Sequence, residues 1–404
     1  MDLCKTAFLA LAMIILSVLY PAHSAAKEET GGRVLLLSAH IGELYYSAEY
    51  HDLFMKDFAK RWGKKVELLH FSPEELADSE ATAQKIKDAA KRPDIKALIL
   101  INAPKGSAAA LKSLRNAQSG LLTLVSDPDE DMQTIAASAD LTVSLNHGAI
   151  AYVNTVLAKR MGAKRIIIFS LPKHLSDVNY GRQYRVMSAA SHDLGLVLSS
   201  DLTCPDPEDP KHDQADVERY LEQAVSRSLK TYGPQTAFMA TGHIQNKLLT
   251  PIVLRNGGFL IGSNFSSPLQ GLPEVLDLVE EARLYFGKWK RLLSVEDEKY
   301  MRIMPPGQMA FWPFPYEHTM AAAITEMAVN ITGSEDKKPD LDQLADLLAK
   351  HSQPVKWQLR RVIDHASGRP VPSAFLVYQD SYWMGHGYQG STKINIPSKY
   401  LEIH

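Results

Sequence analysis

Four histidines, His40, His147, His174 and His243, follow closely on apolar runs that are typical of strands. In open parallel sheets the carboxyl ends of the strands face the ligand crevice, so these side chains could converge there. Converging imidazoles could bind a transition metal or act as general bases. Because no close His-x-His spacing supports chelation, we favour polar residues of a ligand pocket and predict no metal site.

Other polar and aromatic side chains follow the same apolar runs and could hold an organic ligand. Hydroxyls, amides, a few charges and aromatic rings suit a polar solute that is bound by hydrogen bonds and stacking. Each residue could instead cap a helix or form a turn, as Asp127 and Asn146 commonly do. The candidate ligand-binding residues are Ser38, His40, Glu43, Tyr45, Tyr46, Asn102, Ser126, Asp127, Asn146, His147, Lys173, His174, Tyr180, Arg182, Asp201, Thr241, His243, Asn264 and Trp312.

Two further segments have a composition that could serve binding. Residues 311–316 are rich in aromatics and proline, and they could form a stacking wall for a ligand or pack in a hinge. Residues 204–216 contain four aspartates and could take a divalent cation. They lack the glycine and ligand spacing of a calcium loop, so a solvated loop is the favoured interpretation.

Motifs of catalysis and cofactor binding are absent. The sequence contains no GxGxxG, GxxxxGK[ST], HExxH or GxSxG pattern. We therefore predict no catalytic residue and no cofactor, and we expect binding rather than catalysis.

Short apolar runs alternate with amphipathic stretches along the chain, and this order must position the candidate residues. Strands are expected at 33–38, 66–71, 97–102, 121–125 and 141–145, with helical stretches between them. After a helix at 148–161 the pattern restarts, with strands at 165–170, 196–200, 236–240 and 259–262. Strands separated by helices indicate βαβ units and a mainly parallel sheet with helices on both faces.

Beyond residue 272 the pattern changes. One helical region is expected at 273–293, a break at 305–307, and helices at 317–331 and 341–351. A strand is expected at 375–378, and the residues from 385 onward look irregular. The sequence thus predicts an α/β protein. One sheet of nine strands is possible, but two doubly wound parallel-sheet lobes joined by a hinge, with a C-terminal extension, are favoured at this length. Lobe one is expected at 33–146 plus part of 310–404, lobe two at 147–300, and a crossover segment at 301–316.

The first 24 residues have the three parts of a secretion signal. Lys5 precedes an apolar run of about 15 residues, which is shorter than the roughly 20 that span a bilayer as a helix. Small residues at Ala22 and Ser24 predict cleavage before Ala25, and cleavage after Ala26 is a close alternative. An uncleaved membrane anchor is the other interpretation. We expect a mature protein that is released into the periplasm.

Composition narrows the class of partner. The net charge of −2 and the pI near 6.7 give no support for a nucleic-acid partner. Cys4 lies in the expected signal, so Cys204 would remain alone and no intramolecular disulfide is expected. About 380 residues remain after cleavage, enough for two domains with cores that need no disulfides.

The order of elements resembles the type I periplasmic-binding-protein fold, which sugar- and amino-acid-binding proteins share with the effector domains of LacI-like repressors. Asn146-His147-Gly148, a helix, Gly162 and the strand from Arg165 look like the crossing from lobe one to lobe two. Residues 180–184 look like a segment that faces the cleft, and the helix 317–331 with Gly333 looks like the return to lobe one.

The resemblance covers about residues 33–333 and rests on element order. The sequence also resembles an uncharacterised family of exported bacterial proteins within the same superfamily. The region after residue 333 is longer than in simple sugar binders.

The resemblance implies a periplasmic solute-binding protein that captures a small polar organic ligand between two lobes. A membrane transporter or sensor would then recognise the closed form. Two alternatives stay open: an exported hydrolase that uses His and Asp of the cleft loops, and an exported metal-binding protein.

Overall fold

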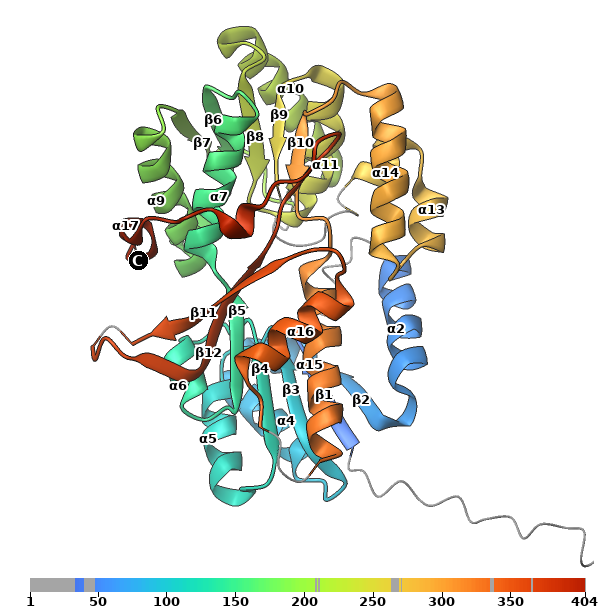
Figure 1. Cartoon of the computed structure of the whole chain (residues 1–404), viewed down its shortest axis with the longest axis vertical. Helices are drawn as coiled ribbons and strands as arrows, with labels where there is room; N and C mark the ends of the chain where they lie inside the picture. The colour runs from blue at the N-terminus through green and yellow to red at the C-terminus, as the bar shows by residue number, and fades with distance from the viewer. Residues whose placement is uncertain are drawn as a thin grey trace, which may run out of the picture.

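Two lobes, each built on a seven-stranded sheet with helices on both faces, make up the protein (Figure 1). In this computed structural model the described residues are 33–39, 48–207, 209, 211–262, 269, 271–334, 338–364 and 366–403. The predicted two-lobed α/β fold is confirmed.

The first sheet is parallel except at one edge. In order across the sheet its strands are β11 (Trp357–Ile363), β12 (Pro370–Gln379), β5 (Leu141–Leu145), β4 (Leu122–Ser126), β3 (Ile95–Ile101), β1 (Arg33–Ser38) and β2 (Val66–His70). Only β11 runs antiparallel to its neighbour. The central strands are continuous apolar runs because both of their faces are buried.

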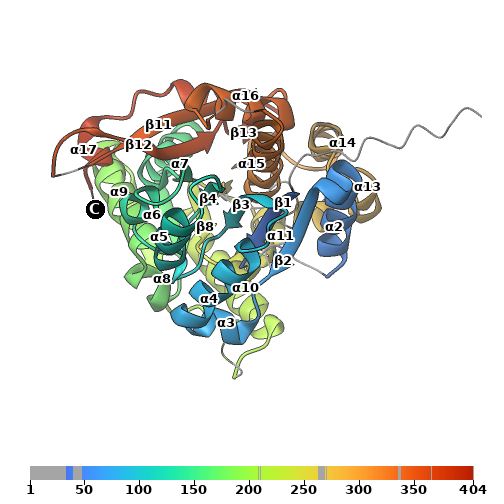
Figure 2. The ribbon, with the colours of Figure 1, turned by 90° about the horizontal axis from the view of Figure 1, so that it is seen from below.

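Helices cover both faces of the first sheet (Figure 2). Leu36 and Ile99 pack in the cluster that contains residues of α15, whereas Leu35 and Leu98 pack with residues of α4 and α5. The helical elements of this lobe are α2 (Ala48–Trp62), η1 (Gly63–Lys65), α3 (Pro73–Ala77), α4 (Ser79–Ala90), α5 (Ser107–Ala117), α6 (Met132–Ala136), α15 (Tyr316–Thr332) and α16 (Leu341–His351).

The second sheet repeats this plan. Its strands in order are β14 (Gly387–Tyr388), β13 (Tyr382–Trp383), β10 (Met309–Phe311), β9 (Phe259–Ile261), β8 (Thr236–Ala240), β6 (Arg165–Phe169) and β7 (Val197–Asp201). The short β13 and β14 are antiparallel, and the other strands are parallel. Its helical elements are α7 (His147–Arg160), α8 (Pro172–Ser176), α9 (Val178–Asp193), α10 (Gln214–Tyr232), α11 (His243–Asn256), α12 (Leu272–Leu276), α13 (Val279–Leu284), α14 (Trp289–Ile303), η2 (Ser391–Lys393) and α17 (Ser398–Leu401).

The described chain passes between the lobes three times. It leaves the first sheet after β5, returns after β10, and leaves again after β12 to add β13 and β14 to the second sheet (Figure 1). Residues that the sequence places in the crossover segment 301–316 include β10, a strand of the second sheet. Each crossing brings residues from the carboxyl end of one sheet close to the other lobe.

The strand β11 was not expected from the sequence, and two other regions also differ from the prediction. The expected single helical region at 273–293 is divided into α12, α13 and α14, because Asp277 and Gly287 adopt left-handed backbone angles (φ +53° and +76°) that interrupt a helix. The region from residue 385, expected to be irregular, contains β14, η2 and α17.

Candidate functional site

The Asp127 carboxylate lies at the carboxyl end of β4, on the edge of the first sheet from which β5 leads into the second lobe. It accepts hydrogen bonds from Ser126 Oγ at 2.6 Å, Ser144 Oγ at 3.2 Å and the Leu145 backbone N–H at 3.2 Å. Burial raises the pKa of Asp127, and the donors, which lower it, do not fully offset this effect.

Tyr316 and Glu317 form the first turn of α15, next to Asp127. Glu317 is buried, and this burial together with the charge of Asp127 raises its pKa to about 8, although the nearby Asn102 amide lowers it. Burial also raises the pKa of Tyr316, whose hydroxyl is close enough to Asp127 to act on the pKa of that carboxyl. Buried acids with strongly raised pKa values are often found at functional sites.

The backbone at Asn102 and Asp127 is unusual. These residues follow the adjacent strands β3 and β4 and adopt left-handed φ angles of +49° and +46°. Asn and Asp are the non-glycine residues that tolerate this region best, but the conformation still costs free energy. The turns therefore direct both side chains from the same edge of the sheet.

In the second lobe, Tyr180 contributes the opposing surface. Its ring stacks on His174 with centroids 5.2 Å apart, and His174 Nδ1 lies 2.7 Å from Thr241 Oγ1, which donates to Ser170 Oγ at 3.0 Å. Burial raises the pKa of Tyr180, and the charge of Glu317 from the other lobe raises it further. The charge of Glu317 thus acts on Tyr180 across the two lobes.

We call Asn102, Asp127, Tyr180, Tyr316 and Glu317 the interlobe cluster. It brings together two carboxyls, an amide and two phenols, which can bind a polar solute through hydrogen bonds, ion pairing and ring contacts. Asn102, Asp127 and Tyr180 are candidates from the sequence.

His147 lies beside the start of α7. Gln183 Nε2 is 2.6 Å from His147 Nδ1, and the neighbouring Arg182 donates to the Leu401 carbonyl oxygen at 2.6 Å. Burial first, and then the charge of Arg182, lower the pKa of His147 to about 4. His147 is therefore neutral at pH 7, and Arg182 is engaged with the C-terminal segment.

Several other candidates have structural partners away from the interlobe cluster. Asp201 accepts from Tyr220 OH at 2.7 Å, and Lys173 forms a 2.8 Å ion pair with Asp206. Asn146 caps α7 by accepting from the backbone of Ala149.

Other candidates lie close to, but outside, the interlobe cluster. Ser38 and Ser126 are buried at the ends of β1 and β4, and Ser126 reaches the cluster through its bond to Asp127. Trp312 is also buried, with its ring 6.3 Å from that of Tyr316. The His174 ring stacks on Tyr180, and the Thr241 hydroxyl lies within hydrogen-bond distance of His174.

Some predictions fall outside the described residues: His40, Glu43, Tyr45, Tyr46, Asn264 and the side chain of His243. Within the described part of the chain, no three His, Cys, Asp or Glu side chains are grouped closely enough to hold a metal ion. In the acidic stretch, Asp213 caps α10 and Asp216 pairs with Arg219 at 2.9 Å.

Sequence analysis missed Glu317 as a site residue, and it included Tyr316 only within the aromatic segment 311–316 and not as an individual candidate. The search followed the residues after strands, whereas these two begin a helix after the chain returns to lobe one. A usable feature was present, because Glu317 is an acid at the start of a largely apolar, alanine-rich helix. Such a helix is expected to be buried, and an acid on it is then unusual.

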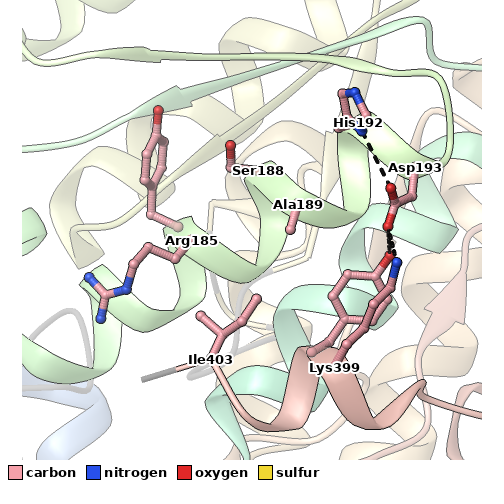
Figure 3. Close-up of a pocket in the computed structure, with 9 residues that line it drawn as sticks. Arg185, Ser188, Ala189, His192, Asp193, Lys399 and Ile403 are labelled. Atoms are coloured by element: carbon pink, nitrogen blue, oxygen red, sulfur yellow. Dashed lines mark hydrogen bonds and ion pairs between the residues drawn. The ribbon is translucent and has the colours of Figure 1, made fainter.

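A separate pocket of about 540 Å³ lies between α9 and α17, on the surface of the second lobe (Figure 3). The Asp193 carboxylate accepts from Lys399 Nζ and Tyr400 OH, both at 2.5 Å, and these bonds lower its pKa. The group holds α17 against α9, so we assign it to docking of the C-terminal segment.

No helix in the described ranges is both long enough and apolar enough to cross a bilayer. The fold is similar to the crystal structure of a protein from Clostridium difficile 630 that is described as a candidate transcriptional regulator. The TM-score is 0.70 at 14% identity, over 87% of this chain and 98% of that chain. The likeness, together with the strand order and the three crossings, shows a type I periplasmic-binding-protein-like fold.

Two uncharacterized proteins of Treponema pallidum (strain Nichols) are similar in sequence. One is 31% identical over 169 residues, 42% of this chain and 77% of the relative. The other is 28% identical over 192 residues, 45% of this chain and 86% of the relative. A second family model matches residues 321–403. Residues 47–295, more than half of the chain, match the family described as "Protein of unknown function (DUF3798)", and the chain belongs to this family.

Proposed function

We propose that this protein is a periplasmic solute-binding protein that captures a small polar organic ligand between its two lobes. A membrane transporter or sensor would recognise the lobes when they are closed on the ligand. The observation that carries the proposal is the interlobe cluster, in which the buried Glu317 of lobe one acts electrostatically on the half-buried Tyr180 of lobe two.

The position of the interlobe cluster supports a binding role. In open α/β sheets ligands bind beyond the carboxyl ends of the strands, and Asn102 and Asp127 follow two such ends. A solute that bridges these residues and Tyr180 would favour one arrangement of the lobes over others. Its binding free energy would therefore stabilise a closed form.

A thermal-shift screen would test this role. The protein would be unfolded in urea and refolded to remove bound solute, and then heated with single sugars, amino acids, nucleosides or amines. A ligand at 100 times its Kd should stabilise the folded protein by about 2.7 kcal/mol. Stabilisation by none of these solutes would contradict the proposal.

Single-residue variants would test whether the solute binds at the interlobe cluster. Asp127→Asn should weaken binding of any solute found in the screen, as measured by isothermal titration calorimetry. Glu218→Gln, an exposed change on α10, serves as the matched control and should leave the affinity unchanged. Conversion of the bound solute to a product, followed by NMR, would instead favour the hydrolase alternative.

We also propose that residues 1–24 are removed during export to the periplasm. Lys5, the short apolar run and the small residues at Ala22 and Ser24 support this proposal. Osmotic shock should release the protein, and mass spectrometry should find a chain that begins at Ala25 or close to it. A full-length chain in the membrane fraction would indicate an uncleaved anchor.

A further inference from the structure

We propose, building on the solute-binding function above, that the ligand carries a cationic ammonium group that pairs with Glu317 in the interlobe cluster. Two carboxyls of lobe one share this region, the half-buried Asp127 and the buried Glu317, and the charge of Asp127 acts on Glu317. Two acids in one buried site favour a cation between them, because their mutual repulsion is then removed.

The described part of the protein does not supply such a cation. No lysine, arginine or histidine in it forms an ion pair with Asp127 or Glu317. Lys173 pairs with another carboxylate, Arg182 donates to a main-chain carbonyl, and His147 is neutral at pH 7. The described residues thus leave the pairing of these two carboxyls to a positive group on the solute.

The two carboxyls also differ in their hydrogen bonding. Asp127 already accepts bonds from two hydroxyls and a backbone N–H, so its position is fixed. Among the described residues, the hydrogen-bond donor that acts on the Glu317 carboxyl is the Asn102 amide, and the nitrogen of that amide is buried without a bond of normal geometry to any described residue. Glu317 is therefore the carboxyl with capacity to bind a ligand.

A second observation concerns Tyr316. This residue is 1% exposed, and its hydroxyl lies near the Asp127 carboxyl and the Ser126 hydroxyl without a hydrogen bond of normal geometry to any described residue. This hydroxyl faces the Asp127 carboxyl closely enough to affect its pKa. A buried group of this kind normally has a partner, and a polar ligand would provide one. The ring of Tyr180, beside Glu317, adds a surface that attracts cations.

This assignment has a proton-linked consequence. Glu317, with its pKa raised to about 8, holds a proton at neutral pH when no ligand is bound. An ammonium group favours the charged carboxylate, so binding should release that proton. The expected release is about 0.9 proton per ligand at pH 7 and about 0.1 at pH 9.

Calorimetry in buffers of different ionisation enthalpy would measure this release. The probes are putrescine, agmatine, choline and basic amino acids, each compared with a neutral hydroxyl analogue of the same size. Glu317→Gln should abolish the proton release and weaken amine binding by about a hundredfold. Glu296→Gln removes another buried acid, which lies on α14 away from the interlobe cluster, and it should change neither quantity.

The outcomes separate this inference from the proposed function. Amine binding with proton release that Glu317→Gln removes would support the inference. Binding of neutral solutes alone, or amine binding without proton release, would overturn it and leave the solute-binding function intact. Binding of no probe of either kind, in this set and in the wider screen, would overturn both.

Discussion

Replacing Glu317 by glutamine should make the ligand-free protein more stable at neutral pH. Glutamine keeps nearly the same shape and hydrogen-bonding capacity but has no proton to lose. In the folded protein, burial holds the Glu317 proton up to a pKa of about 8. In the unfolded chain the same carboxyl ionises near its ordinary value of 4.5, so unfolding releases a proton at pH 7.

The size of the effect follows from these two pKa values. Between pH 4.5 and pH 8, each pH unit favours the unfolded state by about 1.4 kcal/mol, because only that state releases the proton. The stability associated with Glu317 is fully present below pH 4.5 and is lost as the pH rises toward 8. Glu317→Gln should therefore gain about 3 kcal/mol at pH 7 but only about 1 kcal/mol at pH 5.

Urea unfolding, followed by tryptophan fluorescence at pH 5 and pH 7, would measure the free energy of unfolding. Both proteins would first be unfolded and refolded, since a bound solute would stabilise the wild type and reduce the difference. Glu218→Gln, exposed on α10, is the matched control and should match the wild type at both pH values.

A gain that is the same at pH 5 and pH 7 would refute the reasoning, because it would not come from a proton. A variant less stable than the wild type at pH 7 would also refute it. That result would mean that the Glu317 carboxylate is charged and well stabilised in the folded protein.

Three further changes test the surrounding structure by urea unfolding. The depressed pKa of His147, about 4, contributes a loss of about 2 kcal/mol to the wild type between pH 7 and pH 5, which offsets most of the gain from Glu317. His147→Asn, which keeps an acceptor for Gln183, removes this contribution, so its stability relative to the wild type should rise by about 2 kcal/mol from pH 7 to pH 5. The Asp380 carboxylate accepts hydrogen bonds from the Ser391 N–H at 2.6 Å and from the Ser391 hydroxyl at 2.7 Å. Asp380→Ala removes both bonds and should lower the free energy of unfolding by about 3 kcal/mol. A variant as stable as the wild type would contradict this. Gly106→Ala places a Cβ 2.1 Å from the main-chain oxygen of Ser79, at a φ of +100°. This change should lower the free energy of unfolding by at least about 2 kcal/mol, and an unchanged urea midpoint would show that the backbone adapts.

The sequence was sufficient to predict the central strands of both sheets. Residues 97–101 and 165–169 are continuous apolar runs because parallel strands covered on both faces have no polar side. The helices between them followed from their length and periodicity. These features depend only on local composition, so they could be identified without knowledge of tertiary contacts.

The C-terminal strands were harder to predict. β11 contains Arg360 and Arg361 and is only partly buried, because it lies at a sheet edge. β13 and β14 have two residues each and form only by pairing beside β10. Their positions are determined by contacts with distant segments, which a local pattern cannot show.

Two of the five residues in the interlobe cluster were predicted from a rule about strand ends. Asn102 and Asp127 follow β3 and β4, and the alternation of strands was enough to nominate them. Tyr316 and Glu317 reach the same place from a helix start, 189 positions or more after Asp127 in the sequence. Only the return of the chain after β10 brings them together.

The stability effect expected at Glu317 connects the site to the proposed function. At pH 7 the buried acid weakens the empty protein relative to a glutamine in its place, and Asp127 next to it increases this effect. A residue that reduces stability in the empty state is common at sites adapted to bind a ligand. If a cationic solute ionises Glu317, the positive charge of the solute offsets the repulsion between the Glu317 and Asp127 carboxylates as it binds. The same carboxyl would then make the empty cleft less stable and the occupied cleft more stable, which favours closure only when solute is present.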